Sequence, residues 1–130
     1  MQTEIILLGH GSRSLEANHG LIKVANKVTH LVNRPVTPAF VSHGTPDLPS
    51  AIIVKILSGA TRIIIMPLFL FRGMYVSTGI YEEIKDIKEQ FPQIEIIVAK
   101  ELGADDIIAN LAYSRIKETI GHEFSDEPFQ

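Results

Sequence analysis

A run of four aliphatic residues that stops at a histidine between two glycines constrains this chain most strongly. Ile5 to Leu8 contains no polar residue, which is typical of a strand buried on both faces in a parallel sheet. The run ends in Gly9-His10-Gly11-Ser12, where glycine lets the backbone turn sharply and lets another molecule approach closely. Ligands of open parallel sheets bind outside the carboxyl ends of the strands. The sequence therefore predicts chemistry at His10, with Ser12 as the N-cap of the following helix.

The rest of the chain alternates short apolar runs with amphipathic segments. We expect strands over residues 5–8, 36–41, 62–67 and 94–99, and helices over residues 13–32, 48–58, 76–91 and 104–120. This alternation predicts βαβ units with right-handed crossovers. The expected fold is one doubly wound α/β domain over residues 1–120, with a four-stranded parallel sheet in the order 2-1-3-4 and helices on both faces. Residues 121–130 are expected to form a polar C-terminal tail.

Particular side chains place these elements relative to solvent. Pro38 predicts that the second strand lies at an edge of the sheet, since proline cannot donate a ladder hydrogen bond. The charges of the third helix, Glu83 among them, are interpreted as a solvated face. In the last helix we expect an inner face made of Ile108, Leu111, Ala112 and Ile116. The apolar run from Leu68 to Phe71 falls in a loop and needs cover from a ligand, a helix or another subunit.

Composition excludes several classes of function. The chain has 12 Lys and Arg against 15 Asp and Glu, a net charge of −3, which argues against nucleic acid as a partner. It has no cysteine, so disulfides, thiolate zinc sites and thiol catalysis are excluded. The start carries no basic segment before an apolar one, and no apolar stretch reaches the ~20 residues of a membrane helix. We expect a cytoplasmic protein without a membrane contact.

Three side chains at predicted strand ends are candidates for chemistry. His10 is a metal ligand, an acid/base or a phosphorylated group, or else a turn residue bonded to backbone. His43 follows the second strand, and because neighbouring strands lie ~5 Å apart, His10 and His43 can reach one ion. The alternative for His43 is a capping or turn residue. Tyr75 offers a phenol oxygen or stacks within an apolar lid. Neutral imidazoles suit cobalt, nickel, zinc and ferrous iron.

Three segments together resemble the sirohydrochlorin chelatases, the small class II chelatases of the CbiX/SirB type. These segments are Leu7–Arg13, Pro67–Val76 and Leu102–Asp105. The resemblance implies a half-size chelatase domain that pairs as a homodimer. It also implies insertion of divalent cobalt, nickel or iron into sirohydrochlorin or a close relative. The metal is then a substrate, and no tightly bound cofactor is required.

The resemblance also implies roles for individual residues. The first metal-binding histidine of the family falls on His10, the second falls on Tyr75, and a family glutamate falls on Ser42. His10 would deliver the metal or accept a pyrrole proton, while Arg13 and Arg72 would hold the carboxylate arms of the ring. The alternative for both arginines is an exposed surface position. The expected substrate-binding residues are Gly9, Gly11, Ser12, Arg13, Ser42, Phe69, Leu70, Arg72 and Gly73.

The substitution by tyrosine leaves two explanations open. Either His43 and Tyr75 form a variant metal site with His10, or the chain is a catalytically impaired homologue that binds a tetrapyrrole or a metal. A remote alternative is an enzyme like the histidine phosphatases, in which a histidine after the first strand becomes phosphorylated. That family places an arginine directly before its His-Gly pair, where Gly9 stands in this chain.

Overall fold

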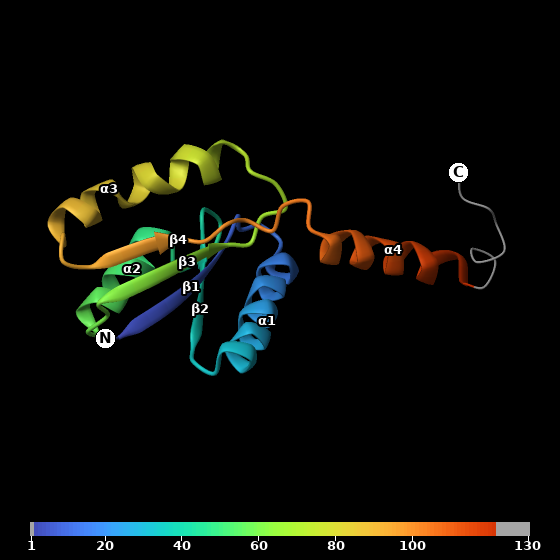
Figure 1. The fold of residues 1–130 in the computed structure, drawn as a ribbon, viewed down its shortest axis with the longest axis horizontal. Coiled ribbons are helices and arrows are strands. Elements are labelled where there is room, and N and C mark those ends of the chain that lie inside the picture. Colours follow the sequence, from blue (N-terminus) through green and yellow to red (C-terminus); the bar gives the residue numbers. More distant parts are fainter. Residues whose placement is uncertain (1, 122–130) are drawn as a thin grey trace.

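β1 (Thr3–Gly9) lies in the interior of a parallel sheet, with β2 (Val36–Phe40) on one side and β3 (Arg62–Pro67) on the other. The computed structural model describes residues 2–121. β4 (Glu95–Val98) pairs with β3, so the order β2-β1-β3-β4 confirms the prediction (Figure 1). The remaining elements are α1 (Leu15–Val32), α2 (Leu48–Leu57), the π-helix η1 (Tyr75–Gly79), α3 (Ile80–Gln90) and α4 (Asp106–Ile120).

Successive side chains of β1 pack into two different cores, because side chains alternate across a strand. Ile6 and Leu8 join the larger core beneath α2 and α3, where Ile52 and Ile84 are fully buried. Leu7 points to the other face and packs with residues of α1. The aliphatic run is therefore buried on both faces, and helices cover both faces of the sheet as predicted (Figure 1).

The two helices that flank the site begin differently from the prediction. α1 starts at Leu15 with Ser14 as its N-cap, because the side chain of Ser14 accepts a hydrogen bond from the backbone of Ala17. Ser12 is not the cap, since its backbone is held by Asn18. The helix expected over residues 76–91 opens with a turn of π-helix, η1, and only then becomes α3.

The prediction that α4 has a buried inner face is wrong within this chain. No residue of α4 is buried, and of the expected inner residues Leu111 is 49% exposed and Ile116 51% exposed. Figure 1 shows α4 leading away from the sheet. Backbone hydrogen bonds from Leu102 to Phe69 and from Gly103 to Leu70 carry the chain past the sheet before the helix begins. An apolar stripe identifies an inner face but does not identify the surface that it meets.

Two further expectations concern the C-terminal tail and membrane-spanning helices. Apart from Gly121, the predicted tail over residues 121–130 lies outside the described residues. Within residues 2–121, no helix combines the length and the apolar character needed to cross a bilayer.

The central position of β1 generates a stability prediction. Replacing the fully buried Ile6 with alanine removes methyl groups from the larger core and leaves a cavity, so Ile6→Ala should lower the free energy of unfolding by about 2–5 kcal/mol. Leu31→Ala is the control, because Leu31 is 84% exposed and its loss should change little. Urea unfolding measures both; equal losses would contradict this packing.

Candidate functional site

The turn after β1 is locked against the segment after β2. The backbone N–H of Val41 donates to Gly9, and that of Ser42 donates to His10, at 2.9 and 3.0 Å. Gly11 has a φ of +86°, and a Cβ at this position would lie 1.6 Å from the carbonyl oxygen of Ser42. Only glycine fits such an approach. The two strand ends predicted to carry chemistry are therefore adjacent.

This locked turn leaves the side chain of His10 exposed. Its imidazole stacks on Phe69, with ring centroids 4.2 Å apart and planes 25° apart. Phe69 is buried, so it forms a fixed floor beneath the imidazole. Neither nitrogen of the imidazole has a hydrogen-bond partner among residues 2–121. The ring is thus positioned by stacking while both nitrogens stay available to a ligand.

A cavity of about 270 Å³ lies beside His10. Its walls come from the turn after β1, from the first turns of α1, and from Phe40 and Leu68. The apolar rim of the site lies on the loop after β3, where Leu70 is 51% exposed, Phe71 67% and Met74 79%. Leu68 and Phe69 are covered by protein, so only part of the predicted apolar run still needs cover.

Tyr75 approaches the same stack from η1. Its ring centroid lies 6.4 Å from that of His10 and 6.0 Å from that of Phe69. The phenol donates a hydrogen bond to the carboxylate of Glu83 on α3. Burial and the neighbouring Glu83 raise the pKa of Tyr75 above its ordinary value of 10.0. Near neutral pH, Tyr75 therefore presents a protonated phenol and not a phenolate, which weakens it as a metal ligand.

Glu83 and Asn18 are site residues that the sequence analysis missed. Glu83 was assigned to a solvated face, yet it accepts the hydrogen bond of Tyr75. Asn18 joins the two strand ends: its amide bonds the backbone N–H and carbonyl of Ser12 at 2.8 and 2.9 Å, and the carbonyl of His43 at 2.7 Å. For Glu83, the signal in the sequence is its spacing of two helical turns from Tyr75.

His43 stands on the other side of the turn and is exposed, with a φ of +53°. Its carbonyl is held by Asn18, and no ring contact joins its imidazole to that of His10 within the described part of the chain. No three His, Asp or Glu side chains of residues 2–121 form a group that holds a metal ion. A shared ion between His10 and His43 stays a prediction.

The two arginines expected to bind anionic arms differ in their surroundings. Arg72 pairs with Glu101 at 3.6 Å, and the Glu101 side chain is only 4% exposed. This pair ties the loop after β3 to the loop after β4. Arg13 is exposed and makes no ion pair with any residue in the range 2–121. Ser42 and Gly73 are also exposed at the same edge of the sheet. Together these residues suit a flat, largely apolar molecule with anionic arms beside a free imidazole.

Known proteins are similar to this chain in sequence and in fold. The CbiX family model matches residues 4–119. The sirohydrochlorin ferrochelatase of Priestia megaterium is 28% identical over 116 residues, which are 88% of this chain and 44% of that protein. The sirohydrochlorin cobaltochelatase of Methanocaldococcus jannaschii is 28% identical over 136 aligned positions, which cover 85% of this chain and 95% of that protein.

Among solved structures, the sirohydrochlorin chelatase SirB from Bacillus subtilis subspecies spizizenii in complex with cobalt aligns with a TM-score of 0.84 and 28% identity. The alignment covers 91% of this chain and 51% of SirB. The chain therefore spans about half the length of the ferrochelatase relatives and of SirB, and nearly the full length of the archaeal cobaltochelatase.

The three hydrogen bonds of Asn18 generate a testable prediction. Asn18→Ala should lower the free energy of unfolding by about 1–3 kcal/mol, because it leaves backbone groups of both turns without a partner. Asn26→Ala, on the exposed side of the same helix, is the matched control. It should change the free energy of unfolding by less than about 0.5 kcal/mol. Urea unfolding of both variants decides; equal effects would show that Asn18 does not join the turns.

The hydrogen bond of Tyr75 predicts a pH dependence. Because the pKa of Tyr75 is raised in the folded state, the unfolded chain loses this proton first as pH rises above 10.0. The folded state should thus lose stability above that pH, and Tyr75→Phe should reduce the loss. Phenolate absorbance should show Tyr75 ionising only well above pH 10.0, and Glu83→Gln should bring the pKa of Tyr75 closer to its ordinary value. Ionisation of Tyr75 at the ordinary pH would contradict this assignment.

Proposed function

This chain belongs to the CbiX family, and from that premise we propose that it is a sirohydrochlorin chelatase. It would insert a divalent metal into a tetrapyrrole of the sirohydrochlorin type. The observation that carries the proposal is the imidazole of His10, which is exposed at the carboxyl end of β1, stacked on Phe69, and free of hydrogen bonds from residues 2–121. Relatives named for iron and for cobalt support either metal, with nickel as the third candidate, always as a substrate.

The proposed substrate lies over the carboxyl edge of the sheet. A flat macrocycle would cover the exposed apolar rim of Leu70, Phe71 and Met74, which removes that surface from water. Arg13 would bind a carboxylate arm in bidentate fashion, because its guanidinium is not engaged by an ion pair within the described residues. Arg72 shares its guanidinium with Glu101 and would contribute less.

His10 would act at the centre of the ring. An imidazole in its neutral form binds a divalent metal or accepts a proton from a pyrrole nitrogen as the metal enters. Stacking on Phe69 sets the plane of the imidazole before substrate arrives, which lowers the cost of orienting it. His43 is the proposed second nitrogen ligand, from the neighbouring turn. The distortion that exposes the pyrrole lone pairs would draw on binding energy from the carboxylate arms.

Tyr75 favours a second candidate function. Its phenol keeps its proton and donates to Glu83, so the position of the family's second histidine presents neither a free nitrogen nor a phenolate. A site of this kind can bind the macrocycle while inserting metal slowly. We therefore retain a tetrapyrrole- or metal-binding homologue as the alternative. The family assignment gives no support to the histidine-phosphatase alternative.

The proposal also includes the oligomeric state of the protein and its location in the cell. The protein would work as a homodimer, because SirB and the ferrochelatase relatives are about twice as long as this chain. It would work in the cytoplasm, without nucleic acid or membrane as a partner.

The proposal predicts the kinetics of two histidine variants. Purified protein is mixed with sirohydrochlorin and cobalt, nickel or ferrous iron, and insertion is followed by the visible absorption spectrum. His10→Ala should slow insertion by about 10²–10⁴-fold, the usual contribution of a positioned acid/base group. His19→Ala, on the exposed surface of α1, is the matched control and should keep the wild-type rate.

Other outcomes separate the alternatives. Equal rates for wild type and His10→Ala would remove His10 from the mechanism. Spectral shifts that show ring binding without insertion, in the wild type and with every metal, would favour the binding homologue.

A further inference from the structure

Glu101, on the loop after β4, is a buried carboxylate. No other charged side chain within residues 2–121 is buried, and that of Glu101 is only 4% exposed. It lines a cavity of about 290 Å³ whose walls include the apolar side chains of Met66, Leu102 and Ile108. Moving a carboxylate from water into such surroundings costs free energy, and an ion pair offsets that cost only in part. Stability therefore gives no reason for a charge at this position.

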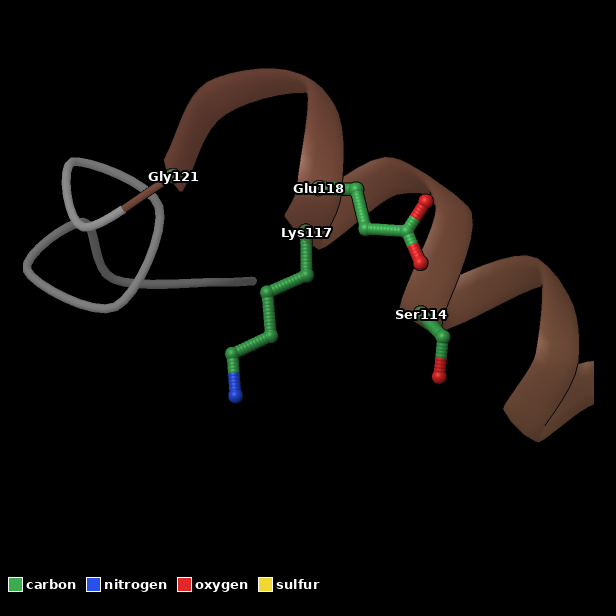
Figure 2. A pocket seen from close by; sticks show the side chains of 4 residues that line it. All are labelled: Ser114, Lys117, Glu118 and Gly121. Carbon is green, nitrogen blue, oxygen red and sulfur yellow. The ribbon is translucent and has the colours of Figure 1, made fainter.

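The ion pair that Glu101 makes differs from the other ion pair of the described residues. Its partner is Arg72, at 3.6 Å on the loop after β3, and no other described side chain pairs or bonds with this carboxylate. The other pair joins Arg115 and Glu118 on α4, and both of these side chains are exposed. Glu118 lies beside an open hollow of about 390 Å³ (Figure 2). Water screens that second pair, so it fixes little.

Backbone hydrogen bonds reinforce the contact between the two loops. The N–H of Leu102 donates to the carbonyl of Phe69 at 3.0 Å. The N–H of Gly103 donates to the carbonyl of Leu70. These bonds lie beside the ion pair in the sequence, so backbone and side chains join the same two loops. The segment that begins at Leu102 thus serves to hold the loop after β3.

The loop that is held in this way carries the floor of the functional site. Phe69 stacks beneath the imidazole of His10, with ring centroids 4.2 Å apart. The backbone carbonyl of Phe69 is one anchor of the loop, and the side chain of Arg72, three residues later, is the other. Phe71 lies between these anchors and is exposed, so packing does little to fix the loop there. The ion pair is therefore well placed to control the position of the floor.

We propose that Glu101 is a positioning residue for the imidazole of His10. It holds Arg72, and with it the loop whose Phe69 lies beneath that imidazole. A group that is oriented before substrate arrives reacts faster than one that must be oriented afterwards. The importance of this orientation for metal insertion rests on the proposed function, whereas the positioning itself does not.

The same ion pair limits what Arg72 offers to a substrate. A guanidinium that is shared with a buried carboxylate has fewer donors left for a carboxylate arm of the ring. Removing the charge of Glu101 would free Arg72 for such an arm while it loosens the loop. The rate of insertion should then fall without any loss of substrate binding, a combination that general destabilisation would not produce.

The first test needs no substrate. Stacking places the ring protons of His10 over the face of Phe69, so their nuclear magnetic resonance signals should lie upfield of those of the exposed histidines on α1. Glu101→Gln keeps the size of the side chain and removes its charge, and it should move the His10 signals downfield. Glu118→Gln breaks the exposed ion pair instead and, as the matched control, should leave them unchanged. Unchanged His10 signals in Glu101→Gln would overturn the proposal.

The partner of the carboxylate supplies a second variant. Arg72→Gln, at an exposed position, should move the His10 signals in the same direction, and it keeps the proposal testable if Glu101→Gln does not fold. The double variant leaves no unpaired charge in the cavity. It should move the signals no further than the single variants do, because all three remove one interaction. Additive shifts would show that the two residues act separately, and would contradict the proposal.

The second test separates orientation from binding in the insertion assay with sirohydrochlorin and cobalt. Glu101→Gln should lower kcat by up to about 10²-fold without raising KM, since a displacement of about 1 Å can cost that much. Arg72→Gln should lower kcat and also raise KM, because it removes a donor to the arm. A raised KM with unchanged kcat in Glu101→Gln would overturn the proposal. A wild type that inserts no metal would refute the proposed function, while the signals of His10 would still decide on the positioning.

Discussion

The backbone after β1 passes so close to the carbonyl of Ser42 that any side chain at Gly11 would collide with it. The geometry of most of the site follows from this close contact between Gly11 and Ser42. Hydrogen bonds between the two turns fix where each strand ends, and Asn18 reaches across from α1 to hold both. The side chain of His10 lies at the exit of β3. There Phe69 lies beneath the imidazole, and solvent lies above it.

Much of the fold could be predicted from the sequence because each of its signals is local. The sheet order could be predicted without knowledge of any contact. It follows from a first strand that is apolar on both faces, from a proline that places the second strand at an edge, and from the alternation of apolar runs. His10 could also be identified, since strand ends in a parallel sheet are where ligands bind. Asn18 could not, because its partners are backbone groups of two turns that only the folded chain brings together, and Glu83 is indicated only by its spacing of two helical turns from Tyr75. α4 could not be placed for a similar reason. Its apolar stripe predicts that one face of the helix is buried, but it does not predict which surface that face packs against.

The surroundings of Tyr75 determine what this side chain can contribute to the site. Its ring lies within the aromatic cluster of His10 and Phe69, so it takes part in the packing around the imidazole. Its hydrogen bond to Glu83 and its raised pKa hold it protonated. In the proposed function, metal binding therefore falls mainly on His10, with His43 on the adjacent turn as the proposed second nitrogen ligand. The proposed function thus depends on what His10 binds.

Nuclear magnetic resonance of the histidine side chains tests this dependence most directly. Cobalt(II) is paramagnetic and broadens the signals of the imidazoles that it contacts, and the chain has only five histidines to assign. In a titration of the full chain with substoichiometric cobalt(II), the account predicts that the His10 signal disappears first, before those of His19 and His30 on α1. Loss of the His19 or His30 signal ahead of that of His10, or equal broadening of all five, would contradict it.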